Sequence, residues 1–436
     1  MCPDRPLDDC RPSTPARGRM PRPGRLVLVL AGAIAIGAAS PPPPPVQLVE
    51  TRPVETALGN PVLPEARSAW LDLIGGAKRS LDFEEFYLST WPGEPMEDVI
   101  RAIGAAAKRG VKVRLLLDAR MHRTYPQPAD SLGKLPGIEL RLIDMGRIAG
   151  GVQHAKYFLV DGASVYLGSQ NLDWRALKHI HELGALVRDR RVSDIFAAVF
   201  EMDWEAAGRD SAAGRPEPVA LDQHEGLPIR IVQSPGDTVA LWPSYSPRSF
   251  IPDTTLWDRD AIVRLLDRAR HEVVVQLLTY SPEDRGKRDP AIDEALRRAA
   301  ARGVRVKLLV SDWEVNSPAI RSLQALATVP NVEAKLSTVS AWSGGYIPFA
   351  RVEHCKYAVV DSQWTWVGTS NWEPGYFEGS RNIAVTLLNR PLALEARRSF
   401  ETSWNASGST PVEPGKRYEP KVRGETPPPG MKKYGG

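Results

Sequence analysis

The stretch HAKYFLVD at residues 154–161 returns as HCKYAVVD at residues 354–361, an offset of 200 residues. In each copy a lysine follows the histidine by two positions, and an aspartate follows the lysine by five. Side chains two positions apart on a strand point to the same face, so each copy predicts a strand that presents a histidine and a lysine to one ligand. The recurrence indicates a chain built from two similar halves.

A turn that ends at an asparagine follows each motif. Its residues are Gly168, Ser169 and Asn171 in the first half and Gly368, Thr369, Ser370 and Asn371 in the second. A phosphodiester is anionic and repels nucleophiles, so a metal-free enzyme needs fixed cations and hydrogen-bond donors around the phosphoryl oxygens. The motif lysines, Lys156 and Lys356, and the two asparagines supply such groups. One motif histidine can attack phosphorus to form a covalent phosphohistidine, while the other protonates the leaving oxygen and then activates water.

A second repeat supports the division into halves. The run KRGVKVRLLL at residues 108–117 recurs as ARGVRVKLLV at residues 301–310, and both have the pattern of a helix end, a glycine stop and a buried strand. Amphipathic helices are predicted at residues 66–78, 96–108, 260–270 and 291–302. Their alternation with apolar β-rich runs predicts a mixed or largely parallel sheet covered by helices. The predicted fold class is α/β, with two pseudo-twofold-related α/β/α sandwich halves that share one active site.

Length and composition are those of a globular protein. At 436 residues, with 25% charged and 42% hydrophobic residues, the chain is neither disordered nor a polytopic membrane protein. Its net charge of +4 favours anionic substrates without identifying one. The predicted segments are 1–45 (signal or anchor with a proline-rich spacer), 46–205 (first half), 206–250 (connection), 251–406 (second half) and 407–436 (flexible tail).

The N-terminus predicts export. Several arginines precede an uncharged apolar run at residues 26–39, which is too short to span a bilayer comfortably and has the length of a signal-peptide core. Translation starting at Met20 would give a signal of ordinary shape, and an uncleaved anchor is the alternative. The expected location is therefore periplasmic or extracellular. Cys2 and Cys10 precede the run, so only Cys355 would remain and no internal disulfide could form.

The paired motifs resemble the signature of the phospholipase D superfamily, which is His-x-Lys-x4-Asp followed by Gly-Ser-x-Asn. The resemblance extends over about residues 54–404. The segments at residues 51–56, 68–71, 347–352 and 368–372 look like those of the branch that holds animal lysosomal membrane members and poxvirus envelope relatives. That resemblance implies type II membrane or envelope proteins, and for the lysosomal members 5′-exonuclease action on single-stranded nucleic acid and handling of phospholipids. This chain departs from the animal members in lacking cysteines for luminal disulfides.

The resemblance also assigns roles to the site residues. It implies that His154 is the nucleophile and His354 the general acid and base, with the reverse assignment left open by the near symmetry of the halves. Glu182 stands where the family places a carboxylate that hydrogen-bonds a catalytic histidine, and the equivalent position in the second half is Asn382.

The remaining motif residues have less defined roles. Asp161 and Asp361 are expected to anchor the strand and its neighbouring loop. Ser169, Thr369 and Ser370 are expected either to donate to phosphate or to shape the turn, and the sequence does not separate the two. No cofactor is expected, and no metal site, because a lysine that would repel a cation follows each motif histidine.

Three functions stay open at this level. The first is hydrolysis of single-stranded nucleic acid by a 5′-exonuclease. The second is a phospholipase D or transphosphatidylase acting on phospholipid head groups, with a membrane surface as partner. The third is a non-catalytic binding protein, which would have no need for two intact lysine–histidine pairs. A monomer is expected, with a dimer as the alternative.

Overall fold

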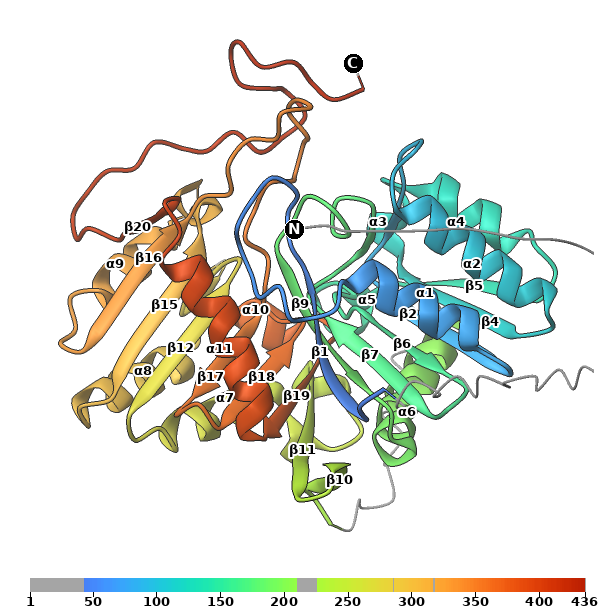
Figure 1. Cartoon of the computed structure of the whole chain (residues 1–436), viewed down its shortest axis with the longest axis horizontal. Coiled ribbons are helices and arrows are strands. Elements are labelled where there is room, and N and C mark those ends of the chain that lie inside the picture. The colour runs from blue at the N-terminus through green and yellow to red at the C-terminus, as the bar shows by residue number, and fades with distance from the viewer. Residues whose placement is uncertain (1–42, 210–225, 285, 317, 436) are drawn as a thin grey trace, which may run out of the picture. The chain divides into compact units, whose positions relative to one another are not determined.

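The computed structural model describes residues 43–209, 226–284, 286–316 and 318–435. Pro44–Gly436 forms one compact unit built on two large sheets (Figure 1). The predicted signal or anchor run lies outside the described residues. Among the helices within them, none has the length and apolar character needed to cross a membrane.

The first sheet has seven strands. In spatial order they are β1 (Val46–Thr51), β9 (Glu182–Val187), β7 (Ser164–Gly168), β6 (Tyr157–Val160), β2 (Ser80–Glu85), β4 (Lys112–Asp118) and β5 (Ile138–Ile143). β2, β4 and β5 run parallel, whereas β6, β7, β9 and β1 pair antiparallel. The sheet is therefore mixed, with its parallel part joined by helical crossovers.

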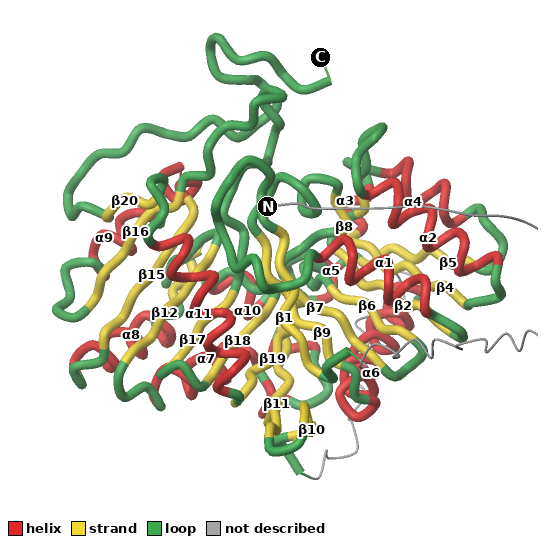
Figure 2. Tube along the Cα trace, in the orientation of Figure 1, coloured by secondary structure: helices red, strands yellow, loops and turns green. Residues whose placement is uncertain are grey.

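The second sheet repeats this order and adds strands at both edges. It contains β10 (Ile229–Ser234), β11 (Asp237–Ser246), β19 (Asn382–Leu388), β18 (Trp364–Gly368), β17 (Tyr357–Val360), β12 (Glu272–Leu277), β15 (Arg305–Ser311), β16 (Val332–Ser337) and β20 (Ser409–Pro411). Two short pairs complete the strands: β3 (Leu88–Ser89) with β8 (Leu172–Asp173), and β13 (Glu283–Asp284) with β14 (Lys287–Arg288). The two large sheets meet through β7, β9, β18 and β19 in the middle of the unit (Figure 2).

Helices cover both sheets. The first half carries α1 (Ala66–Gly76), α2 (Met96–Lys108), α3 (Ala119–His122), α4 (Pro126–Gly133), α5 (Met145–Ile148) and α6 (Arg190–Gly208). The second carries α7 (Asp258–Asp267), α8 (Ala291–Ala301), α9 (Ile320–Leu326), α10 (Pro374–Glu378), α11 (Arg390–Trp404) and 3-10 turns at Arg248–Phe250, Thr254–Leu256 and Asp312–Asn316. The four helices predicted from periodicity are present, and α2 has the predicted bounds. The predicted α/β class with two related halves is confirmed.

Two segments differ from their expected roles. The sequence predicts a connection over residues 206–250, but β10 and β11 form there and β11 pairs with β19. Burial alternates along β10, where Ile229 and Ile231 are buried, whereas most residues of β11 are buried, as expected for a strand inside the sheet. The tail predicted as flexible adds β20 to the sheet edge, and its Tyr434 hydroxyl donates to Glu94 at 2.8 Å.

Side chains that alternate along β6 belong to two different hydrophobic clusters, one on each face of the first sheet. In β6, Phe158 packs on one face of the sheet with Trp70 of α1, and Tyr157 packs on the other with Phe196 of α6. The cluster that contains Tyr157 continues into the second half through β17 and α11. The two halves therefore share one core, which stabilises their arrangement around the motifs.

The two motif aspartates, Asp161 and Asp361, make the same main-chain contacts in the two halves. Asp161 has a left-handed backbone, with φ of 56°, and its carboxylate accepts from the main-chain nitrogens of Lys78, Arg79 and Ser80 at 2.6–3.1 Å. Asp361 makes the equivalent contacts with the nitrogens of residues 270–272. Each aspartate thus joins the turn after a motif strand to the start of the neighbouring strand.

Replacing Asp161 should destabilise the fold. Asp161→Ala removes the acceptor of three backbone donors, and we expect the free energy of unfolding to fall by about 1–3 kcal/mol. These hydrogen bonds outweigh the opposing effect of burial and lower the pKa of Asp161. Its contribution to stability is therefore present above the ordinary aspartate pKa and lost as pH falls through the lowered pKa. Denaturant unfolding across this acid range measures both effects.

A surface aspartate provides the control. Asp194 lies 3.7 Å from Arg190 in an exposed pair, so Asp194→Ala should change stability by less than about 0.5 kcal/mol. Equal effects of the two substitutions would contradict the assigned role of Asp161.

Candidate active site

The two motif histidines stand just before β6 and β17, and each is anchored on the opposite half. The main-chain nitrogen of His154 donates to the carbonyl of Arg381 at 2.9 Å, and that of His354 donates to the carbonyl of His181 at 2.9 Å. The fold thereby brings both motifs to the junction of the two sheets.

The Nδ1 atoms of the two histidines have different partners. His154 Nδ1 lies 3.0 Å from Asn382 Oδ1, and His354 Nδ1 lies 2.7 Å from Glu182 Oε2. Asn382 is oriented by its own contacts, because its amide nitrogen donates to the carbonyls of Tyr376 and Ser380. Each Nδ1 therefore faces an acceptor and carries a proton, which leaves Nε2 as the atom available for chemistry.

The motif lysines are fully buried beside the histidines. Lys156 Nζ donates to the carbonyl of His154 at 2.6 Å, and Lys356 Nζ donates to that of His354 at 2.9 Å. Burial lowers the pKa of Lys156 well below its usual range and that of Lys356 to about 8, while the charge of Glu182 opposes both shifts. Glu85, buried next to Lys156, also opposes the Lys156 shift, and burial raises the pKa of this carboxyl well above its usual range.

Burial and the two ammonium groups also lower the pKa of both histidines well below the usual range. Without an anion in the site, both imidazoles are therefore neutral at neutral pH. An anionic phosphoryl group placed between the lysines would offset the positive charge and favour protonation of one histidine.

The turn asparagines keep their amide groups available for a ligand. The side-chain oxygens of Asn171 and Asn371 are buried and have no hydrogen-bond partner among the described residues. An amide oxygen only accepts hydrogen bonds, so a water or hydroxyl proton would satisfy it, whereas a phosphoryl oxygen would be met by the amide nitrogens of these side chains.

The turn hydroxyls, by contrast, are engaged within the protein. Ser169 Oγ exchanges hydrogen bonds with the main chain of Leu183, and Thr369 Oγ1 donates to Asn382 Oδ1 at 2.9 Å. Ser370 Oγ donates to Asp258 at 3.0 Å. In this arrangement the three hydroxyls shape the turns, while the motif aspartates lie at the far ends of the motif strands.

Of the other neighbours of the site, the sequence singles out His181, beside Glu182, and Tyr376, after the second motif, but not Phe86 or Arg381. The rings of Phe86 and Tyr376 lie 5.1 and 4.8 Å from that of His154. Arg381 and His181, which hold the histidine main chains, are fully buried. Arg381 stands directly before Asn382, as His181 stands before Glu182, and this equivalent place in the repeat is the signal that could have identified it.

Comparisons with known proteins agree with this two-motif geometry. Residues 70–204 and 262–404 each match the family model described as "Cardiolipin synthase, PLD-like domain". The chain is 30% identical over 389 residues to phospholipase D Z of Dictyostelium discoideum, covering 84% of this chain and 90% of that protein. It is 34% identical over 341 residues to the 5'-3' exonuclease PLD3 of Bos taurus, covering 72% and 69% of the two chains.

A solved structure supports the fold independently. The phosphatidylserine synthase of Haemophilus influenzae superimposes with a TM-score of 0.62 at 12% identity, covering 86% of this chain and 89% of that one. At this identity the likeness concerns the fold alone.

Anion binding should depend on the charge of Lys356. The pKa of about 8 means that this ammonium group is charged below pH 8 and neutral above it. We expect the affinity for sulfate, whose own charge is constant here, to fall about tenfold or more as pH rises through this value. Calorimetric titration with sulfate at a series of pH values measures the fall.

Lys356→Arg tests the origin of that effect. A guanidinium stays charged throughout this range, so the variant should show no fall near pH 8. A fall of the same size in the variant would show that another group is responsible.

Proposed function

The chain belongs to the phospholipase D superfamily and is a phosphodiesterase, and on that basis we propose that it degrades single-stranded nucleic acid from the 5′ end. The two halves at residues 46–205 and 251–406 would each contribute one histidine and one lysine to a single reaction centre. The proposed reaction needs no metal, because the lysines supply the positive charge around the phosphoryl oxygens.

The observation that favours nucleic acid is the aromatic surface beside His154. Phe86 and Tyr376 flank the histidine, Tyr87 packs 5.5 Å from Phe86, and Tyr125 lies 5.2 Å from Tyr87. The guanidinium of Arg175 is 5.8 Å from the Tyr125 ring. That guanidinium is buried and paired with Asp173, so it supports the Tyr125 ring and is not a free cation. Bases of a single strand stack on rings arranged in this way. Similarity to proteins named 5'-3' exonucleases points the same way.

Phospholipid is the second candidate substrate. Similarity to the Dictyostelium phospholipases D favours it, and the same reaction centre could act on a head-group phosphodiester. The exposed large hydrophobic residues of the described part are Val62, Trp91, Leu142, Val232, Phe349, Leu394 and Val422. They are scattered along the chain, and none belongs to the motifs or turns that form the site, whereas an interfacial enzyme needs an apolar rim there.

The Nδ1 partners favour one assignment of roles. The carboxylate of Glu182 stabilises a positive imidazolium, so His354 is the better general acid and base. The neutral amide of Asn382 leaves His154 uncharged, with its Nε2 lone pair free to attack phosphorus. This agrees with the roles that the family resemblance implies.

Two balanced steps follow. Nε2 of His154 forms a bond to phosphorus as the ester P–O bond breaks, and the leaving oxygen takes a proton from Nε2 of His354. His354 then takes a proton from water, the resulting hydroxide attacks phosphorus, and the P–N bond breaks. The phosphate monoester leaves and both histidines return to their starting state.

Export is part of the proposal. Its basis is the N-terminal sequence, and an exported enzyme would meet nucleic acid or membrane lipid outside the cytosol. Detection of the N-terminus of the mature protein by mass spectrometry would distinguish cleavage from a retained anchor.

Substrate assays test the function directly. With a chelator present, the protein should degrade a 5′-hydroxyl single-stranded oligonucleotide, and His154→Ala and His354→Ala should each lower the rate by about 10³-fold or more. Arg298→Gln, which removes an exposed ion pair with Asp267, should leave the rate unchanged. Head-group release from phospholipid vesicles without loss of oligonucleotide would move the assignment to a phospholipase, and inactivity on both substrates would favour a binding protein.

Trapping the intermediate tests the roles of the histidines. In His354→Asn the second step should be blocked, so bis(4-nitrophenyl) phosphate, whose leaving group needs no proton, should release one nitrophenolate and leave a 4-nitrophenylphosphoryl group on His154. Mass spectrometry of peptides prepared at alkaline pH would locate it. The assignment would be reversed if the trapped group were found on His354 in a His154→Asn variant and were absent from His154 in the His354→Asn variant.

A further inference from the structure

We propose that His181 and Arg381 are positioning residues, each of which holds the reactive histidine of the opposite half. His181 would control proton transfer by His354, and Arg381 would control attack by His154. The inference rests on the proposed function, because it assigns one step to each histidine. Neither residue takes part in the two chemical steps described above.

The first support is the main-chain geometry. His181 donates its main-chain N–H to Val352 O at 3.0 Å and accepts from His354 N at 2.9 Å, as in a short parallel bridge centred on Glu353. Arg381 forms the matching bridge, donating to Val152 O at 3.0 Å and accepting from His154 N at 2.9 Å. Each bridge fixes the chain on both sides of the residue that precedes a reactive histidine.

The next residue of each bridge holds the imidazole. Glu182 follows His181 and accepts from His354 Nδ1, and Asn382 follows Arg381 and lies against His154 Nδ1. A dipeptide from one half thus binds both the main chain and the ring of a histidine in the other. We call residues 181–182 the His354 clamp and residues 381–382 the His154 clamp.

Buried charge fixes the His154 clamp. The guanidinium of Arg381 donates to both carboxylate oxygens of Asp203 at 2.5 and 2.7 Å and to the carbonyl of Ser246 at 2.7 Å. Both charged side chains are fully buried. Breaking such a pair leaves an uncompensated buried charge, so the position of Arg381 is strongly determined.

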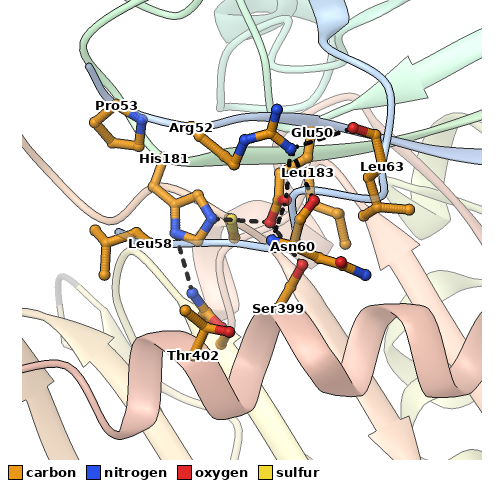
Figure 3. Close-up of polar contacts among 12 residues, drawn as sticks. Glu50, Arg52, Pro53, Leu58, Asn60, Leu63, His181, Leu183, Ser399 and Thr402 are labelled. Atoms are coloured by element: carbon orange, nitrogen blue, oxygen red, sulfur yellow. Dashed lines mark hydrogen bonds and ion pairs between the residues drawn. The ribbon is translucent and has the colours of Figure 1, made fainter. Parts of the chain in front are cut away.

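The His354 clamp is fixed by a different set of charges. The imidazole of His181 lies between two carboxylates, with Nδ1 2.7 Å from Glu353 and Nε2 3.0 Å from Glu50. Figure 3 shows this ring directed at Glu50, which also accepts from the main-chain nitrogen of Asn60 and the hydroxyl of Ser399, both at 2.6 Å, and lies 3.9 Å from the guanidinium of Arg52. Because Glu353 immediately precedes His354, this cluster acts directly on the chain that carries the reactive ring.

The charge state of His181 agrees with this arrangement. Burial alone would lower the pKa of His181, but the neighbouring Cys355 and Glu353 groups raise it well above its usual range. With a carboxylate facing each ring nitrogen, this shift favours the doubly protonated ring, and the amide nitrogen of Gln276 lies 3.4 Å from Nδ1 as well. His181, Glu353 and Cys355 are also close enough to hold a metal ion, which a protonated His181 would not coordinate.

The alternative is that these charges contribute only to folding. A substrate comparison separates the two roles, since an alkoxide leaving group needs a proton from His354, whereas 4-nitrophenolate does not. A variant in which His354 is misplaced should therefore lower the rate of oligonucleotide cleavage far more than the rate of the first nitrophenolate release. A fault in His154 positioning should slow both equally.

The experiment uses His181→Gln and Glu353→Gln for the His354 clamp, and Arg381→Lys and Asp203→Asn for the His154 clamp. We expect the first two to lower kcat/KM for the oligonucleotide about 10- to 100-fold, with the first-turnover rate on bis(4-nitrophenyl) phosphate changed less than about threefold. A burst of nitrophenolate should precede their slow turnover. Arg381→Lys and Asp203→Asn should lower both rates by similar factors, without a burst.

Both substrates are measured on the same preparation, so any unfolded fraction cancels from the ratio of the two rates. Glu353→Gln removes the same contact from the other side and keeps the test valid if His181→Gln does not fold. Arg298→Gln is the control and should leave both rates unchanged.

Equal losses on the two substrates in the His354 clamp variants would overturn the inference and leave a structural role. Inactivity of the unaltered protein on both substrates would instead refute the proposed function.

Discussion

The site depends on keeping two ammonium groups inside the protein. Lys156 and Lys356 are fully buried and lie close enough for the charge of one to disfavour that of the other. Removing ammonium groups from water is expensive, and the nearby carboxylates of Glu85 and Glu182 offset only part of that cost. The pocket is therefore short of negative charge until an anion enters it. A phosphodiester supplies that charge where the two imidazoles can act on it.

The site that holds these two ammonium groups can be built only from both halves of the chain together. Each reactive histidine takes its main-chain acceptor and its Nδ1 partner from the opposite half, so neither half contains a complete reaction centre. One hydrophobic core runs through both halves and stabilises their relative position at the junction. The fold thereby provides the rigid arrangement that a preorganised electrostatic site needs.

Departures from the pseudo-twofold symmetry explain how two similar motifs can do different work. Glu182 corresponds to Asn382, so one imidazole faces a carboxylate and the other an amide. Behind them, His181 corresponds to Arg381, and each uses a different set of buried carboxylates. A carboxylate stabilises the positively charged imidazolium more than an amide does, so these few substitutions are enough to separate an acid from a nucleophile.

The sequence by itself determined the parts of this protein that rest on local periodicity. The spacing of His154 and Lys156 on one strand face, the repeat at residue 354, and the bounds of α2 follow from contacts within a few residues. The strands β10 and β11 are not predicted, because the Gly, Pro and Ser content of residues 206–250 is typical of a loop and β11 is defined by its pairing with β10 and β19. Only the tertiary structure decided which partner each histidine has, since Asn382 lies 228 positions from His154 and Glu182 lies 172 from His354. Local sequence carries no record of such distant pairings, which arise when the shared core brings the two halves together.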